Sequence, residues 1–407
     1  MVHDGSKSLM IHKPPSNEIL LSLPNELWLE IFWHACSMPG VDEFSADFER
    51  HMDIYSVEGN STTVIDHQSF RAALKCRLGL SLVCHGWTRL TTPILWSHLR
   101  ISLDNFPTIS NTLRLKPELG LYVRRITPME EHLRLALFIQ KYDDDNLLGD
   151  IIRLCPHLIS VHVPILSDQL SYAFPPSLRN ANLFWRFSRI GLPLLPPNLT
   201  SLTLELSHQP QWTSPVPTLQ LPSLCALNIC QLTLHEVWVD GITKNWDFPS
   251  LQILVISGGN WRGLVAILKR FAATLRTLKI YGRLSSTEED VGDSIRLPLL
   301  SRLDILTYCE IGPLAKSLHL PNLTTLVVYW PYYQEIPFFD GAKDLSVASY
   351  LHFLNALQGW CPQSATIVFE PGDFVEWVIR QRAIATILTS MRNGGRRMIL
   401  PKEGGPI

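Results

Sequence analysis

The sequence predicts an α/β protein with a small helical module near the N-terminus and a long body of stacked short strands. Two observations predict this fold. A Leu-x-x-Leu-x-Leu pattern recurs from residue 158 onward, and apolar residues between positions 21 and 97 recur at helical spacing. The chain has 407 residues, of which 46% are hydrophobic, so it is long and apolar enough to bury a large core.

The repeated pattern begins at eight leucines separated by 20 to 27 residues, which are Leu158, Leu178, Leu199, Leu224, Leu251, Leu275, Leu300 and Leu323. Alternation of Leu-x-Leu is typical of a short strand whose leucines face one side and whose intervening residues face the other. One such unit cannot bury its apolar side alone, whereas a stack of units buries a continuous core. We therefore expect an irregular solenoid with a parallel sheet on its concave face and helices that cap its C-terminal end.

The residues between the leucines are expected on the outward side of this sheet. They mix charges with tyrosines, and tyrosine and arginine are enriched in protein interfaces. Such a face suits binding of a target protein and equally suits contact with solvent. The candidate target-binding residues are Thr203, Glu205, Lys279, Tyr281, Arg302, Asp304 and Tyr329.

The N-terminal module is expected to contain three short helices. Pro24 suits the first turn of a helix in which Leu27 and Ile31 form one apolar stripe and Trp28 and Phe32 form a second. A second helix is expected over residues 69–90, and Thr92 followed by Pro93 predicts the start of a third. Three such helices bury little surface, which points to a partner.

The ordered motifs of this module resemble an F-box, the helical motif that binds the Skp-type adaptor of cullin–RING ubiquitin ligases. They are a Leu-Pro start at residues 23–24, a Val-Cys-x-x-Trp at 83–87 and a closing Leu-Trp at 95–96. The whole chain is similar to F-box proteins of the leucine-rich-repeat kind. The resemblance implies adaptor contacts by Leu23, Pro24, Leu27, Ile31, Val83, Trp87, Leu95 and Trp96.

What the resemblance implies is a substrate-recognition adaptor of an SCF-type ubiquitin ligase, which binds a target protein through the repeats. Two alternatives stay open. One is an F-box-like leucine-rich scaffold that acts outside a ligase, with its helical segment packed against the repeats. The other is an unrecognised enzyme with a cleft between the repeats and the C-terminal helices.

The expected organisation has five segments. They are a disordered lead-in over 1–18, the helical module over 19–100, a linker or first degenerate repeat over 101–157, the solenoid over 158–340, and a helical cap and tail over 341–407. Within the helical module, residues 37–68 carry seven acidic residues and one arginine, so this stretch is interpreted as a solvated insertion, either passive or regulatory.

Composition and motifs exclude several classes of function. The formal net charge of −2 gives no electrostatic footprint for nucleic acid or an anionic membrane. No secretory signal, membrane-spanning stretch, catalytic motif or metal-ligand spacing is present, and residues 258–263 are interpreted as a turn. We expect no metal, no cofactor and no enzymatic activity, with a cytoplasmic or nuclear location. The eight cysteines are expected to be reduced thiols of the core.

Overall fold

The computed structural model describes thirteen stretches of the chain, which are 23–36, 67–102, 105–128, 147–165, 174–185, 194–206, 218–232, 241, 243–285, 294–306, 311–329, 347–369 and 382–399. These residues divide into two compact units. We call residues 23–36 and 67–97 the helical unit, and the described residues from His98 onward the sheet unit. The expected insertion over 37–68 lies outside the described residues up to position 66.

The helical unit contains the helices α1 (Asn25–Cys36), α3 (His67–Ser81) and α4 (His85–Trp96). A single helix over 69–90 was the wrong expectation, because the chain turns at residues 82–84 and Cys84 is extended (φ −160°, ψ 167°). The expected helix start at Thr92 was also wrong. The Thr92 hydroxyl donates back to the Thr88 carbonyl (2.7 Å) instead of capping a new helix, and Pro93 lies inside α4.

The sheet unit is built on a twelve-stranded parallel sheet in which the strands lie side by side in chain order. The expected α/β class with a parallel sheet is confirmed. Its strands are β1 (His98–Ile101), β2 (Arg125–Pro128), β3 (Ser160–Ile165), β4 (Asn180–Trp185), β5 (Ser201–Leu206), β7 (Ala226–Leu232), β9 (Ile253–Asn260), β10 (Thr277–Ser285), β12 (Arg302–Leu306), β14 (Thr325–Tyr329), β15 (Thr366–Phe369) and β16 (Met398–Ile399). The sheet therefore begins before residue 158 and continues beyond residue 340.

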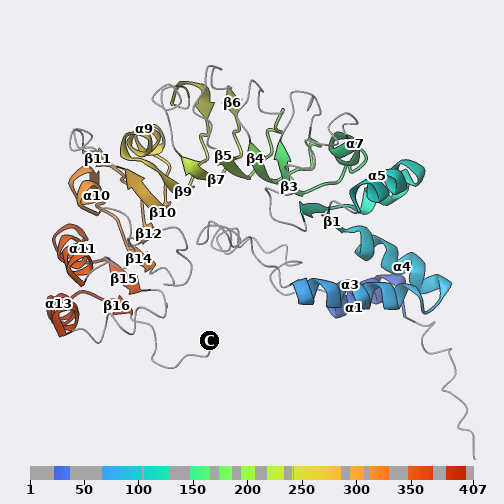
Figure 1. Cartoon of the computed structure of the whole chain (residues 1–407), viewed down its shortest axis with the longest axis horizontal. Coiled ribbons are helices and arrows are strands. Elements are labelled where there is room, and N and C mark those ends of the chain that lie inside the picture. Colours follow the sequence, from blue (N-terminus) through green and yellow to red (C-terminus); the bar gives the residue numbers. More distant parts are fainter. Residues whose placement is uncertain are drawn as a thin grey trace, which may run out of the picture. The chain divides into compact units, whose positions relative to one another are not determined.

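The described helices of this unit lie along the outer, convex side of the curve, and the strands of the sheet lie along its inner, concave side (Figure 1). They are α5 (Phe106–Leu115), the 3₁₀ helix η1 (Pro117–Tyr122), α7 (Leu147–Arg153), α9 (Trp261–Phe271), α10 (Ile311–Ser317), α11 (Val347–Trp360) and α13 (Arg382–Asn393). Two small parallel pairs join β6 (Leu219–Gln220) to β8 (Trp246–Asp247) and β11 (Ile295–Arg296) to β13 (Leu318–His319). The expected turn over 258–263 is wrong, because β9 runs directly into α9.

One main-chain carbonyl from each repeat holds the start of the next strand. The carbonyl of Arg179, for example, accepts the N–H groups of Thr200 (2.8 Å) and Ser201 (3.0 Å). The same double acceptance recurs at the carbonyls of Arg124, Ile159, Thr200, Cys225, Gln252, Arg276 and Ser301. Buried backbone groups need such partners, so this ladder fixes the register of the sheet from β2 to β14.

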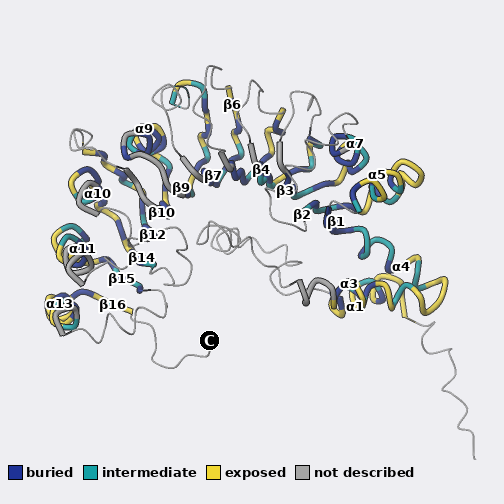
Figure 2. Tube along the Cα trace, viewed as in Figure 1, coloured by how far each residue is buried: buried dark blue, intermediate teal, exposed yellow. Residues whose placement is uncertain are grey.

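The repeated leucines occupy equivalent places in this arrangement. Leu199 closes a turn by donating its N–H to the Pro196 carbonyl (3.1 Å), and Leu251 does so to Phe248 (3.1 Å). The next leucines along each strand pair across the sheet in an unbroken row, as in Leu202 with Leu227 and Leu278 with Leu303. All of these side chains are buried, and Figure 2 shows burial continuing along the strands while exposed residues gather on the helices.

Gly120 in η1 makes a backbone approach that no other residue type allows. A Cβ atom there would lie 1.9 Å from the carbonyl oxygen and 2.9 Å from the carbonyl carbon of Leu154. We predict that Gly120→Ala lowers the free energy of unfolding by about 1–3 kcal/mol, since the backbone after α7 has to move. Urea unfolding followed by circular dichroism measures the change.

The matched control is Gly359→Ala in α11, where a Cβ atom would meet nothing within 4 Å. Alanine stabilises a helix interior by roughly 1 kcal/mol relative to glycine, so this variant is expected to be slightly more stable than the parent chain. Equal stability of the two variants would contradict the packing role assigned to Gly120.

Candidate docking surface and charged strand cluster

Three aromatic side chains hold the helical unit together. The ring centroids of Trp28 and Phe32 on α1 lie 5.4 Å and 4.8 Å from that of Trp87 on α4, within the range of favourable aromatic contacts. Cys36 and Ile94 complete the buried cluster. Trp87, which was expected to contact an adaptor, is half-buried in this core. Its indole packs α4 against α1 through the contacts with Trp28 and Phe32.

A second side of α1, about 100° around the helix from the core side, is apolar and exposed. Leu23, Leu27 and Ile31, which we call the α1 stripe, are 38%, 44% and 45% exposed. Leu27 and Ile31 lie about one turn apart on this side and Leu23 lies just before the helix, while Trp28 and Phe32 face the core. Pro24, also exposed, lies just before α1, and its carbonyl accepts the N–H groups of Leu27 (3.1 Å) and Trp28 (3.2 Å).

A second group of exposed aliphatic side chains lies at the turn between α3 and α4. Val83, an expected adaptor contact, is 60% exposed, and its neighbour Leu82 is 84% exposed. Leu78, one helical turn before Leu82, is exposed as well. Sequence reasoning did not single out Leu78, in α3, or Leu82, in the turn that follows, although their spacing of four residues was a usable signal. Leu95 and Trp96, at the end of α4, are only half-buried.

The outward positions of the strands align in rows because the register has few shifts. Asn182, Thr203 and Asn228 follow one another across β4, β5 and β7. The same row continues through Val255 to Lys279 and Asp304, which are paired directly across β10 and β12. The sheet thus places a lysine beside an aspartate although 25 residues separate them in the sequence.

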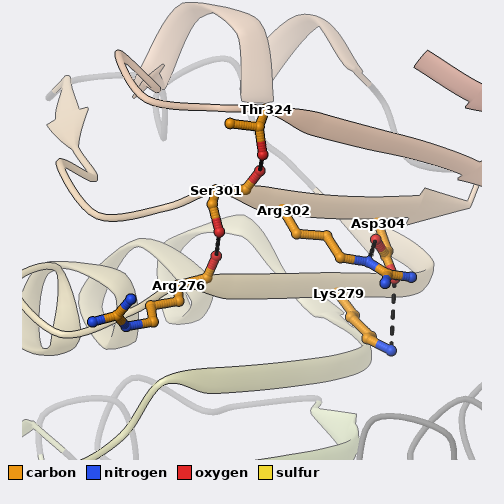
Figure 3. A network of polar contacts seen from close by, with 6 residues as sticks. All are labelled: Arg276, Lys279, Ser301, Arg302, Asp304 and Thr324. Carbon is orange, nitrogen blue, oxygen red and sulfur yellow. Dashed lines mark hydrogen bonds and ion pairs between the residues drawn. The ribbon is translucent and has the colours of Figure 1, made fainter. Parts of the chain in front are cut away.

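Lys279 and Asp304 of this row form a charged cluster with Arg302, which lies two residues before Asp304 on β12 (Figure 3). The Asp304 carboxylate accepts two hydrogen bonds from the Arg302 guanidinium, from Nε at 2.8 Å and from NH2 at 3.1 Å. Its Oδ2 atom also lies 3.6 Å from the Lys279 ammonium nitrogen. Both Lys279 and Asp304 have 0% exposed side chains, while Arg302 keeps 30% of its side chain in solvent.

Four of the seven candidate target-binding residues have little accessible surface in this sheet. Thr203, Lys279, Tyr281 and Asp304 are buried. Parallel sheets are commonly buried on both faces, and here the Lys279 ammonium and the Asp304 carboxylate meet across neighbouring strands. Arg302 and Tyr329 are partly exposed, and the Tyr329 ring lies 5.7 Å from that of Tyr281. The side chain of Glu205 lies outside the described residues.

The charged cluster is flanked by hydroxyl contacts at the starts of the strands. Ser301 donates to the Arg276 carbonyl (3.3 Å) and Thr324 donates to the Ser301 carbonyl (2.9 Å), as Figure 3 shows. Within the described stretches, no group of three histidine, cysteine or carboxylate side chains could hold a metal ion. None of the helices among these residues is both long and apolar enough to cross a bilayer.

We predict that Asp304→Ala lowers the free energy of unfolding by roughly 3–5 kcal/mol, because it leaves the buried Lys279 ammonium without its carboxylate. Ser301→Ala is the matched control, because Ser301 lies next to Arg302 in the sequence. It removes only the hydroxyl contact to the Arg276 carbonyl, at a cost in unfolding free energy below about 1 kcal/mol. Urea unfolding of both variants measures the difference. Equal losses would show that Asp304 is no more than a surface polar residue.

Comparison with known proteins adds little to this description. No protein-family model matches the chain, and no curated protein matches it. One solved structure that resembles it is the crystal structure of a protein from Bacteroides fragilis, with 15% sequence identity and a TM-score of 0.30. The match covers 66% of this chain and 72% of that chain. A similarity this low carries no argument about function, so any functional conclusion rests on the residues described above.

Proposed function

We propose that the chain is the substrate-recognition adaptor of an SCF-type cullin–RING ubiquitin ligase. In this proposal the helical unit binds a Skp-type adaptor and the sheet unit binds a target protein. The observation that carries the proposal is the exposure of the α1 stripe beside a fully formed aromatic core. The motifs between residues 23 and 96 occur in the order found in an F-box, and this resemblance implies a Skp-type adaptor as the partner of the stripe.

The physical argument starts from the cost of exposing aliphatic side chains. Leu27 and Ile31 each leave close to half of their surface in water, although Trp28 and Phe32 on the same helix are buried. Contiguous apolar patches of this kind mark interaction sites on proteins. Residues spaced by four on a helix also match the way amphipathic helices dock into apolar grooves. A protein partner that covers the α1 stripe would gain this buried area.

The helical unit offers further apolar area for the same kind of contact. Leu82 and Val83 are the most exposed of its large apolar side chains, and they lie at a turn whose backbone is held by helices on both sides. Short turns between packed helices present their side chains with little conformational freedom. Preorganised aliphatic groups favour docking, because little entropy is lost when the partner binds.

The chain performs no bond chemistry in this proposal. It brings a target close to the separate enzyme of the ligase and so raises the effective concentration of the target's lysines. Among the expected target-binding residues, the partly exposed Arg302 and Tyr329 are the ones placed to contact a protein directly. The buried Lys279 and Asp304 position the Arg302 guanidinium through their shared contacts.

A scaffold that acts outside a ligase is the alternative. That function requires the α1 stripe to pack against another part of the same chain, which would bury Leu27 and Ile31. The two functions also differ in what a Skp-type adaptor does in solution, since only the first forms a stoichiometric complex.

We predict that Leu27→Ala combined with Ile31→Ala weakens binding of a Skp-type adaptor by about 10- to 100-fold. Each truncation removes an aliphatic contact worth on the order of 1 kcal/mol at the interface. The full-length chain co-expressed with the adaptor is analysed by size-exclusion chromatography, and the Kd is measured by isothermal titration calorimetry. The circular dichroism spectrum stays unchanged, because neither side chain supports the core.

Glu26→Ala combined with Glu30→Ala is the matched control, since both glutamates are exposed on the same helix. This control is expected to bind the adaptor within about threefold of the parent chain, as rim charges contribute little affinity. A parent chain that is folded but never co-elutes with the adaptor would refute the ligase function and favour the scaffold. Equal binding by both double variants would refute the α1 stripe as the docking surface.

A further inference from the structure

Two cysteines of the helical unit lie in direct contact. Cys36 is the last residue of α1 and is buried, while Cys76 lies in the middle of α3 and is half-buried. The Cys36 thiol donates to the sulfur of Cys76 with an Sγ–Sγ distance of 3.3 Å. The two residues are 40 positions apart, so only the packing of α1 against α3 brings the sulfurs together.

Polar contacts hold both cysteines in place. The Arg77 guanidinium, on the residue next to Cys76, donates to the Cys36 carbonyl at 3.1 Å. The Cys76 thiol also lies 3.7 Å from the carbonyl oxygen of Ala35. These contacts tie the C-terminal end of α1 to α3 at the level of the two sulfurs. A disulfide has an S–S distance of about 2.05 Å, so small side-chain rotations are the main movement required.

We propose that Cys36 and Cys76 form a reversible disulfide that joins α1 to α3. The co-reactant is a small-molecule disulfide such as oxidised glutathione. The Cys76 thiolate attacks one glutathione sulfur, which breaks that S–S bond and releases one reduced glutathione. The Cys36 thiolate then attacks the Cys76 sulfur of the mixed disulfide and releases the second. Two protein thiols are oxidised, one disulfide is reduced, and the two thiol protons end on the glutathione products.

The two cysteines differ in solvent accessibility, as these two steps require. Cys76 is half-buried and is the sulfur that a small molecule can reach first, whereas Cys36 is 1% exposed. A buried resolving thiol next to a reachable one favours closure of the intramolecular bond, because its effective concentration is high. For this pair the inference goes beyond the expectation of reduced core thiols.

Other described cysteines lack this arrangement. Cys84 is exposed at the turn before α4, against the expectation of a core thiol. Burial raises the pKa of Cys155 to about 12 and raises the pKa of Cys361 above its ordinary value, so both stay protonated near neutral pH. Thiolate formation is required for exchange, and these two thiols serve as internal negative controls.

The disulfide would have a defined structural consequence. It would close residues 36–76 into a covalent loop that contains the acidic segment over 37–66. Closing a loop of this length restricts the unfolded chain and stabilises the folded helices. Cys36 lies with Trp28 and Phe32 in the core cluster, so the bond would leave the α1 stripe uncovered. The inference does not depend on the proposed function.

The test titrates the full-length native chain with oxidised and reduced glutathione, blocks remaining thiols with N-ethylmaleimide, and maps peptides by mass spectrometry. The expected result is a peptide pair linked through Cys36 and Cys76, formed at a concentration of oxidised glutathione at least about tenfold lower than that which modifies Cys84. The melting temperature of the oxidised chain rises and returns after reduction with dithiothreitol. Cys155 and Cys361 remain thiols and carry no glutathione.

Cys84→Ser is expected to keep the linked pair, and Cys76→Ser is expected to abolish it without changing the circular dichroism spectrum. The result that overturns the inference is a native chain in which Cys84 is fully modified while Cys36 and Cys76 remain unlinked. Linkage that appears only in urea would overturn it equally, because the contact of the two sulfurs in the folded chain would then play no part.

Discussion

The sheet unit depends on the main-chain carbonyl that each repeat offers to the start of the next strand. From Arg124 to Ser301, such a carbonyl accepts two successive N–H groups. Because both donors come from the residues directly after a buried leucine or its equivalent, the leucine and the strand that follows are placed together. The number of residues from one repeat to the next can therefore vary, here from 20 to 27 between equivalent leucines, while the register between strands stays constant.

This register also explains the charged cluster. The inward-facing strand positions are occupied by aliphatic side chains throughout, so these side chains supply the free energy gained by burying apolar surface. The outward row is free to vary, and it changes from Asn182, Thr203 and Asn228 to valine and then to Lys279 and Asp304. A buried lysine is stable here because the neighbouring strand brings a carboxylate, and Arg302 supplies that carboxylate with two more hydrogen bonds. Neither charge would be tolerable if the strand slipped by one residue.

The repeat spacing was enough to predict the parallel sheet and the inward leucines, because period and burial follow directly from the sequence. It could not predict how far the sheet extends. β1 and β2 lack the full pattern, and β15 follows α11, so both ends are recognised only through pairing with their neighbours. α9 was missed although Trp261, Leu264 and Leu268 have helical spacing, because the glycines before them favour a turn in an isolated segment. Burial of the outward row depends on tertiary packing, which no local pattern encodes.

In the helical unit the sequence offered two apolar stripes on α1 and no means of choosing the one that faces the core. The choice is made by Trp87, whose ring contacts both Trp28 and Phe32. Aromatic rings bury more area per residue than leucine or isoleucine, so a unit with so few helices gains most by turning them inward. The aliphatic stripe is then left outside as a consequence of the packing. The side chains that form the core and those of the exposed α1 stripe thus lie on different sides of the helix, about 100° apart, so the stripe can be substituted with little effect on the core.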